Sequence, residues 1–297
     1  MGDTSITPRG RASNATFTAR DERENLMEAE KVHLTKEKET SLITLYSRAL
    51  ESRSKDSVLR DEAAEEAIRR IDYDFGRLKL RKVEPLSIAI RAKQFDLWTS
   101  QYLAETPQAT VLHLGCGLDS RVFRLNPSAS VRWFDVDYPE VIEIRRRLYP
   151  ERAGYFMIGS SVTDPSFLDE IPTDRPAMIV AEGVMMYLAD HDVKPLLNRL
   201  TNHFPSGLMA FDALSRLGAR MAKADPSVKA TGASFRWGIN DPQDIKHLEP
   251  RLELVTEMKI PDMPGYSKLP WTMRALVRVM EPIPTLRRLS RLLLYQF

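Results

Sequence analysis

After residue 108 the chain alternates between short apolar runs and helical patterns, and this rhythm limits its possible folds more than any other feature. Strand-like apolar runs occupy residues 110–114, 131–136, 155–158, 177–181 and 208–212. Helical patterns follow several of them, most clearly over 138–148 and 190–204. Strands that alternate with helices indicate βαβ units, which bury a parallel sheet under helices on both faces. We therefore predict an α/β fold with a mostly parallel sheet.

The first third of the chain carries no strand signal. Residues 1–20 are rich in Ser, Thr, Gly and Arg without periodicity, as expected of a mobile tail. Helical spacing of apolar residues recurs over 21–52, 61–68 and 85–104. We expect a helical cap over 21–108, ahead of a core domain over 109–297.

The last third interrupts the alternation. Residues 215–249 are polar and contain several glycines, so we expect an insertion after the fifth strand, over the ligand edge of the sheet. Residues 252–258 alternate like a sixth strand. The final apolar run, 292–297, is either the end of an amphipathic helix or a buried last strand, because periodicity cannot separate the two.

Charge and composition narrow the class of protein. The 297 residues hold 43 Lys and Arg against 41 Asp and Glu, so no general basic excess points to nucleic acid. From Lys268 onward, however, the chain contains six basic residues and a single acidic residue, Glu281. Such a segment can contact an anionic membrane or partner. The interpretation we favour is that its helices cover the sheet and its last six residues complete it.

Several other classes are excluded or disfavoured. The single cysteine, Cys116, rules out a disulfide framework and a cysteine-based zinc site, and no histidine pair has metal-ligand spacing. No apolar run is long enough to span a bilayer, and the N-terminus lacks the apolar region of a secretory signal. We expect a soluble, cytoplasmic protein that needs no metal.

The sharpest motif is a strand that ends in Gly115-x-Gly117, followed twenty residues later by Asp137 at the end of the next strand. Glycines there let the backbone approach a ligand, and the acid can accept hydrogen bonds from two ribose hydroxyls. Asp135 competes for this role. Ser120 replaces the third glycine of the dinucleotide motif, and Asp119 would repel a diphosphate. The pattern thus favours S-adenosylmethionine over NAD.

A second motif covers 178–188, where an apolar strand ends in Glu182-Gly183. The carboxyl ends of strands in an open parallel sheet form the ligand crevice, so Glu182 is expected there. Met186 and Tyr187 follow directly. Core packing is the simpler interpretation for the methionine.

Together these motifs resemble the leucine carboxyl methyltransferase family, and within it the small-molecule O-methyltransferases of the tetracenomycin polyketide type. The resemblance extends in order from residue 47 to residue 188. Its segments are Ser47-Arg48-Ala49-x-Glu51-Ser52, Ile90-Arg91-x-x-x-Phe95-Asp96, Leu114-Gly115-x-Gly117-x-Asp119-x-Arg121-x-x-Arg124-Leu125, Asp135-Val136-Asp137-Tyr138-Pro139 and Ala181-Glu182-Gly183-x-x-x-Tyr187-Leu188.

The resemblance implies a class I, Rossmann-like methyltransferase of secondary metabolism and assigns roles to individual residues. Arg91 matches the arginine that holds the methionyl carboxylate of S-adenosylmethionine, with Arg48 as a possible assistant. Asp137 matches the ribose-binding acid, and Gly115 and Gly117 form the cofactor turn. Glu182 matches the glutamate near the methionyl amino group and the sulfonium.

The chain departs from the family pattern at the adenine. The position that often carries an aspartate falls here on Ser161, beside Val162. A serine oxygen can accept the same hydrogen bond without charge, and Asp164 is a nearby substitute.

We expect the molecule that accepts the methyl group to bind in a pocket that includes Met186, Tyr187, Arg236 and Trp237. An arginine between aromatic rings would suit an anionic, planar molecule. No catalytic base is predicted, because a carboxylate acceptor is already ionised at neutral pH, whereas an ordinary phenol needs a base.

Our leading hypothesis is an S-adenosylmethionine-dependent O-methyltransferase that acts on a carboxylate or acidic phenol of a small, polyketide-like molecule. The alternatives are a methyltransferase of protein C-terminal leucine, a non-catalytic methyltransferase-like scaffold and an NAD-dependent oxidoreductase. The sequence identifies neither the acceptor nor the oligomeric state.

Overall fold

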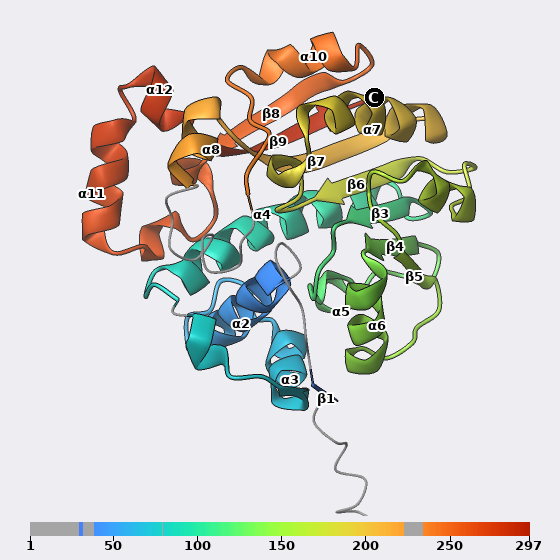
Figure 1. Cartoon of the computed structure of the whole chain (residues 1–297), viewed down its shortest axis with the longest axis horizontal. Helices are drawn as coiled ribbons and strands as arrows, with labels where there is room; N and C mark the ends of the chain where they lie inside the picture. Colours follow the sequence, from blue (N-terminus) through green and yellow to red (C-terminus); the bar gives the residue numbers. More distant parts are fainter. Residues whose placement is uncertain (1–29, 32–38, 79, 223–233) are drawn as a thin grey trace, which may run out of the picture.

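The computed structural model describes residues 30–31, 39–78, 80–222 and 234–297 (Figure 1). The expected tail at 1–20 and the first part of the helical pattern at 21–52 lie outside these ranges, apart from residues 30–31.

A seven-stranded sheet forms the centre of the molecule, in the order β5-β4-β3-β6-β7-β9-β8. Strands β3 to β7 pair in parallel, and β9 lies antiparallel between β7 and β8. The strands are β3 (Thr110–Leu114), β4 (Arg132–Asp137), β5 (Tyr155–Gly159), β6 (Ala177–Ala181), β7 (Gly207–Leu214), β8 (Glu253–Lys259) and β9 (Ser290–Gln296). The predicted α/β fold with a mostly parallel sheet is confirmed, and each predicted strand is present within about two residues of its expected position.

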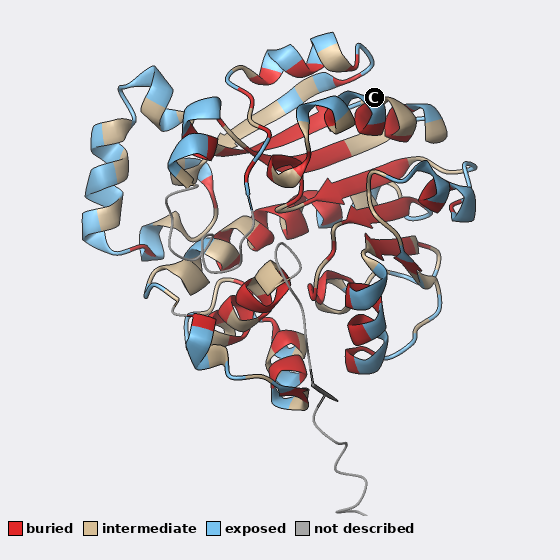
Figure 2. Cartoon of the chain, viewed as in Figure 1, coloured by how far each residue is buried: buried red, intermediate tan, exposed pale blue. Residues whose placement is uncertain are grey.

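Helices bury both faces of this sheet, which explains why its central strands are apolar throughout. Alternate residues of β3 show the two sides: Leu112 packs in one cluster, beneath α7 (Asp190–His203), and Val111 in another, beneath α4 (Glu84–Glu105). Figure 2 shows the buried residues concentrated in the central strands and on the inward sides of the helices.

Residues of α2, α3 and α6 form a third apolar cluster. The helices not yet placed are α2 (Thr40–Ser52), α3 (Glu62–Arg70), α5 (Arg121–Leu125), α6 (Pro139–Leu148), α8 (Arg216–Ala222), α10 (Ile245–Leu248), α11 (Trp271–Met280) and α12 (Pro284–Arg287).

One small element lies where the sequence shows no strand signal. Strands β1 (Glu30–Lys31) and β2 (Ile71–Asp72) form a parallel pair of two residues each. Segments this short leave no alternation of apolar and polar residues to detect.

The last strand settles the ambiguity of the final apolar run. Strand β9 is buried along most of its length between β7 and β8, and the Tyr295 ring stacks on Phe211 with 5.4 Å between centroids. The expected final strand is therefore confirmed.

The basic helices before it do not cover the sheet as expected. Neither α11 nor α12 contains a buried residue, and both lie at the side of the molecule beyond α8 (Figure 1). Arg274, Arg278 and Arg287 are exposed, because the arginines follow the outward faces of these short helices. Within the described ranges, no helix has the length and apolar character needed to cross a membrane.

A truncation in β9 tests the role of this strand in the core. We expect Leu293→Ala to lower the free energy of unfolding by about 2–5 kcal/mol, since the loss of this fully buried side chain would leave a cavity between β9 and the helices that cover it. Urea unfolding measures the change. The matched control, Leu276→Ala on exposed α11, should stay within about 0.5 kcal/mol of wild type. Equal effects of the two substitutions would contradict the burial of β9.

Candidate functional site

A cavity of about 320 Å³ opens above the carboxyl ends of the parallel strands, between the sheet and helices α2 and α4. This volume is typical of small-molecule sites, and the position is the one where open α/β sheets bind ligands. Ten of the twelve residues predicted to bind the cofactor or the methyl acceptor line it: Arg48, Arg91, Gly115, Gly117, Asp137, Ser161, Val162, Glu182, Met186 and Tyr187.

The turn after β3 forms the floor of the cavity. Gly115 and Gly117 both have positive φ, +56° and +51°, a conformation that side chains other than glycine rarely adopt. A Cβ on Gly115 would also lie 2.4 Å from a methyl carbon of Val184. The two glycines therefore let the backbone turn here and leave its N–H groups close to the cavity.

Asp137, and not Asp135, faces the cavity. The Gly117 N–H donates to Asp137 Oδ2 at 2.7 Å, and the Tyr138 N–H donates to Oδ1 at 2.7 Å, so the carboxylate is held at the mouth of the turn. Burial raises the pKa of Asp137. Asp135 is 1% exposed and is bound by Arg145 and His113, which leaves it a structural role.

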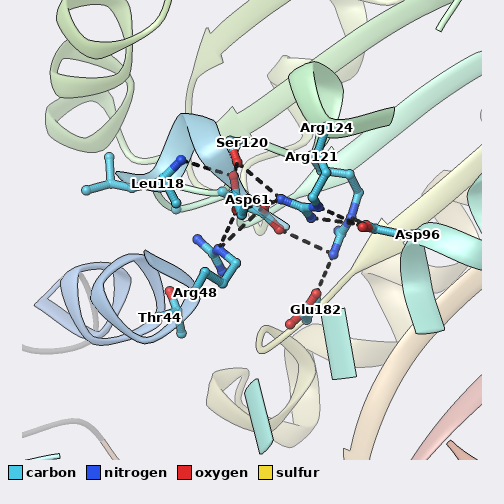
Figure 3. Close-up of polar contacts among 12 residues, drawn as sticks. Thr44, Arg48, Asp61, Asp96, Leu118, Ser120, Arg121, Arg124 and Glu182 are labelled. Atoms are coloured by element: carbon cyan, nitrogen blue, oxygen red, sulfur yellow. Dashed lines mark hydrogen bonds and ion pairs between the residues drawn. The ribbon is translucent and has the colours of Figure 1, made fainter. Parts of the chain in front are cut away.

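Beneath the turn, a buried network of arginines and aspartates joins the N-terminal helices to the sheet (Figure 3). Arg124 donates to Asp61 at 2.7 Å and to Asp96 at 2.7 Å. The Ser120 hydroxyl donates to Asp61 as well. The residue that departs from the dinucleotide motif thus helps to attach α3 to the glycine turn after β3.

Arg121 is the centre of this network and is fully buried. Its guanidinium donates to Asp96 at 2.9 Å, lies 3.2 Å from Asp119 and donates to Glu182. Burial works against ionisation of Asp119, but Arg48, Arg121 and Arg124 together hold its pKa well below the usual range. Arg91 and Arg121 likewise lower the pKa of Glu182 against the effect of burial, so the network favours the ionised form of both carboxylates.

Arg48 has unused hydrogen-bonding capacity. It is 2% exposed and lies 3.5 Å from Asp61 and 3.8 Å from Asp119, as measured from its Nε. Its Nε and Nη2 atoms are nevertheless buried without a hydrogen-bond partner in the described structure. A buried donor without a partner costs roughly 1–3 kcal/mol, so an anionic ligand in the cavity would stabilise this side chain.

Arg91 lies between two carboxylates. Its Nε donates to Glu182 at 2.8 Å and its Nη1 donates to Asp212 at 3.1 Å. Asp212 also accepts the Gly183 N–H at 2.6 Å, and burial raises the pKa of its carboxyl group. Sequence reasoning missed Asp212, although its place at the end of a predicted strand could have indicated it.

Ser161 lines the cavity, whereas Asp164 does not. The Ser161 hydroxyl hydrogen-bonds the Thr163 hydroxyl at 2.9 Å. Asp164 is exposed and caps the following turn by accepting the Ser166 N–H at 2.9 Å. It is therefore not placed as the substitute that the sequence suggested.

The outer wall of the cavity is aromatic. Tyr187 and Phe235 line it together, with 5.0 Å between ring centroids, and Met186 packs beside them. The N–H groups of Arg236 and Trp237 both donate to the Met186 carbonyl, at 2.7 Å and 3.2 Å. The end of the 215–249 segment is thereby attached to the loop that follows β6.

Two acceptor residues expected from the sequence do not line the cavity. Arg236 is exposed, and the buried Trp237 packs against Phe211 in the core beneath β7. Because neighbours in an extended segment point to opposite sides, Phe235 faces the pocket and Arg236 faces away from it. The prediction that Arg236 lies between aromatic rings in the pocket is therefore wrong.

Helices α2 and α4 contribute lining residues that sequence reasoning missed. Ile43 and Thr44 come from α2, and Glu84 and Ile88 come from α4. The spacing of Glu84, Ile88 and Arg91 places all three on one side of the helix, a signal available in the sequence. Among the described residues, no group of three or more His, Cys, Asp or Glu side chains is arranged to hold a metal ion.

Comparisons with known proteins agree with this geometry. The family model described as leucine carboxyl methyltransferase matches residues 41–153. The tetracenomycin polyketide synthesis O-methyltransferase TcmP of Streptomyces glaucescens is 44% identical over 268 residues, which cover 90% of this chain and 99% of that protein. The S-adenosyl-L-methionine-dependent methyltransferase dpfgK of Gibberella zeae is 32% identical, over 84% of this chain and 92% of its own length.

A solved structure shares the fold. A DUF574 family protein from Streptomyces avermitilis superposes with a TM-score of 0.53 at 15% identity, over 84% of this chain and 96% of that one. The sequence similarity and the cofactor-type turn lead to the same conclusion: the chain belongs to the leucine carboxyl methyltransferase family and is an S-adenosylmethionine-dependent methyltransferase.

Proposed function

We propose that this protein transfers a methyl group to a carboxylate or acidic phenol oxygen of a small, polyketide-like molecule. The observation that carries the proposal is a cavity that joins a nucleoside-binding turn to an apolar, aromatic wall. The name of its 44% identical relative, a tetracenomycin polyketide synthesis O-methyltransferase, supports the same acceptor class.

The residues present fit S-adenosylmethionine. Asp137 would accept hydrogen bonds from the ribose hydroxyls, and Ser161 and Val162 would border the adenine. The unpaired donors of Arg48 and the guanidinium of Arg91 would hold the methionyl carboxylate. The unpaired donors of Arg48 support a larger role for this residue than the assisting role inferred from the sequence.

The charge of the lining favours the same cofactor. Among the described residues, four carboxylates line the cavity against two arginines, Arg48 and Arg91. The carboxylates belong to Glu84, Asp119, Asp137 and Glu182. An excess of negative charge attracts a cofactor that carries both an ammonium and a sulfonium, and it repels the diphosphate of NAD.

Methyl transfer needs alignment more than acid–base catalysis. S-adenosylmethionine, when bound, would supply an electrophilic methyl group to an acceptor oxygen, and the sulfur would keep the electron pair of the S–CH₃ bond. The cavity walls hold the acceptor oxygen in line and exclude water.

His113, which lines the cavity, is poorly placed to remove a proton from the acceptor. Its Nδ1 is 3.1 Å from Asp135 and its Nε2 is 3.0 Å from Arg121. Because an arginine can only donate, Nε2 accepts and Nδ1 carries the proton. With both nitrogens occupied, the protein suits an acceptor oxygen that ionises without a strong base.

We further propose that residues 21–108 act as a cap over the cofactor and that the 215–249 insertion selects the acceptor through Phe235. Phe235 lies in the described part of the insertion, and its side chain lines the cavity.

One assay distinguishes the candidate reactions. The protein is incubated with S-adenosylmethionine and rhein, an anthraquinone that carries both a carboxylate and phenols, and the product is analysed by mass spectrometry before and after mild alkali. A methyl ester is cleaved by alkali, whereas an aryl methyl ether survives. Either product supports the proposal.

The alternative functions predict different outcomes when a protein acceptor is tested beside rhein. Methylation of a phosphatase catalytic subunit with a C-terminal leucine, but of no small aromatic acid, would favour the protein carboxyl methyltransferase. Binding of S-adenosylmethionine without transfer to either acceptor would favour a non-catalytic scaffold.

The pKa of Asp137 predicts how cofactor affinity depends on pH. The ionised carboxylate accepts the ribose hydrogen bonds, and burial raises its pKa above the ordinary value of about 3.9. Affinity for S-adenosylhomocysteine should therefore be constant near neutral pH and fall as the pH drops through this raised value. Calorimetric titrations from neutral pH down toward the ordinary aspartate pKa of about 3.9 measure the decline. If Asp137→Asn shows the same pH dependence as wild type, the assignment to Asp137 is wrong.

A further inference from the structure

The side of α4 that faces the cavity carries lining residues at both ends of the acceptor space. Arg91 lies beside Glu182, at the end where the cofactor residues gather. Glu84 lies seven residues earlier on the same side of the helix, roughly 10 Å away along its axis. The cavity therefore has a second polar group, away from the proposed reaction centre.

The surface between these two ends is mostly apolar. Ile88 lies between Glu84 and Arg91 on α4, and Ile43 lines the cavity from α2. The Tyr187 and Phe235 rings also belong to the lining. Such a space suits a flat aromatic molecule that buries its rings and presents polar groups at its two ends.

Glu84 differs in its partners from two of the other three cavity carboxylates, Asp119 and Glu182. Asp119 and Glu182 each form ion pairs with arginine. Glu84 Oε2 accepts the Arg81 N–H at 3.1 Å, and within the described chain no lysine or arginine side chain forms an ion pair with Glu84. The half-buried carboxylate of Glu84 can therefore still accept a hydrogen bond from a donor group in the cavity.

We propose that Glu84 determines acceptor specificity by accepting a hydrogen bond from a hydroxyl group at the end of the acceptor opposite the methylated oxygen. This inference rests on the proposed O-methyltransferase function. It defines the acceptor class as an aromatic molecule with an acidic oxygen at one end and a neutral hydroxyl at the other. A second carboxylate beside Glu84 would be repelled.

Two probes that differ only in the distal hydroxyl test this role: 6-hydroxy-2-naphthoate and 2-naphthoate. Their dissociation constants are measured by calorimetry on the full chain saturated with S-adenosylhomocysteine. A hydrogen bond to a carboxylate predicts that wild type binds the hydroxylated probe roughly tenfold more tightly. Glu84→Ala should bring the ratio close to one, and Glu84→Gln, a neutral acceptor, should leave a smaller preference.

The design separates recognition from helix capping. Glutamine keeps a side-chain oxygen for the Arg81 N–H, so Glu84→Gln should retain the melting temperature and the affinity for S-adenosylhomocysteine. Glu105→Gln, at the exposed far end of the same helix, is the matched control and should retain the wild-type ratio.

Equal binding of both probes by wild type, binding of neither, or an unchanged ratio in Glu84→Ala would each overturn the inference. The proposed function is tested separately: absence of methyl transfer to any aromatic acid with S-adenosylmethionine contradicts that function, whereas the binding ratio does not depend on turnover.

Discussion

Replacing Asp137 by alanine should reduce the affinity for S-adenosylhomocysteine by roughly 100-fold or more. Hydrogen bonds to a charged group contribute about 1.5–3 kcal/mol each, and this carboxylate would accept two from the ribose. It also accepts hydrogen bonds from the Gly117 and Tyr138 N–H groups, so its removal should loosen the turn proposed to hold the cofactor. Isothermal titration calorimetry of the purified chain measures the loss.

Two further variants show whether this loss is specific. Asp137→Asn keeps the size of the side chain and should lose less affinity than alanine. Asp169→Ala removes an exposed aspartate from the turn after β5 and should bind like wild type. Unchanged affinity in Asp137→Ala would mean that another residue holds the ribose.

Replacing Arg121 by methionine should produce the largest loss of stability, about 3–5 kcal/mol. The substitution removes the one guanidinium that Asp96, Asp119 and Glu182 share, so these buried carboxylates keep only Arg48, Arg91 and Arg124 as counter-charges. Removing one partner from a buried ion-pair network is far costlier than losing a surface pair. For a chain of this size the melting temperature should fall on the order of 10 °C. Urea unfolding and calorimetry measure both quantities.

An exposed arginine provides the comparison. Arg69 pairs with Glu66 on the surface of α3, with both side chains about 60% exposed, so Arg69→Met should change stability by no more than about 0.5 kcal/mol. A loss below 1 kcal/mol in Arg121→Met would show that the network contributes little to stability.

Much of the fold could be predicted from local patterns. The βαβ rhythm predicted each parallel strand, because strands buried on both faces remain apolar and glycine or polar turns separate them from helices. The last strand could not be assigned, since a short apolar run has no period that separates strand from helix. The pairing of this segment with both β7 and β8 in the folded chain identifies it as a strand.

The cofactor side of the site was more predictable than the acceptor side. Gly115, Gly117 and Asp137 are tied to strand ends, and the parallel topology brings strand ends together. The prediction that Arg236 lines the acceptor pocket was wrong. The sequence places this arginine between two aromatic residues, but the alternation of side chains along the segment turns it toward solvent. Glu84 was missed because its role depends on how α4 lies against the cavity.

The most direct test of the account is a crystal structure of the chain with S-adenosylhomocysteine. We predict that the ribose hydroxyls lie within hydrogen-bond distance of Asp137, and that the methionyl carboxylate contacts Arg48 or Arg91. The sulfur should face the space lined by Tyr187 and Phe235. A ligand bound elsewhere, or a sulfur that points away from this aromatic wall, would contradict the account.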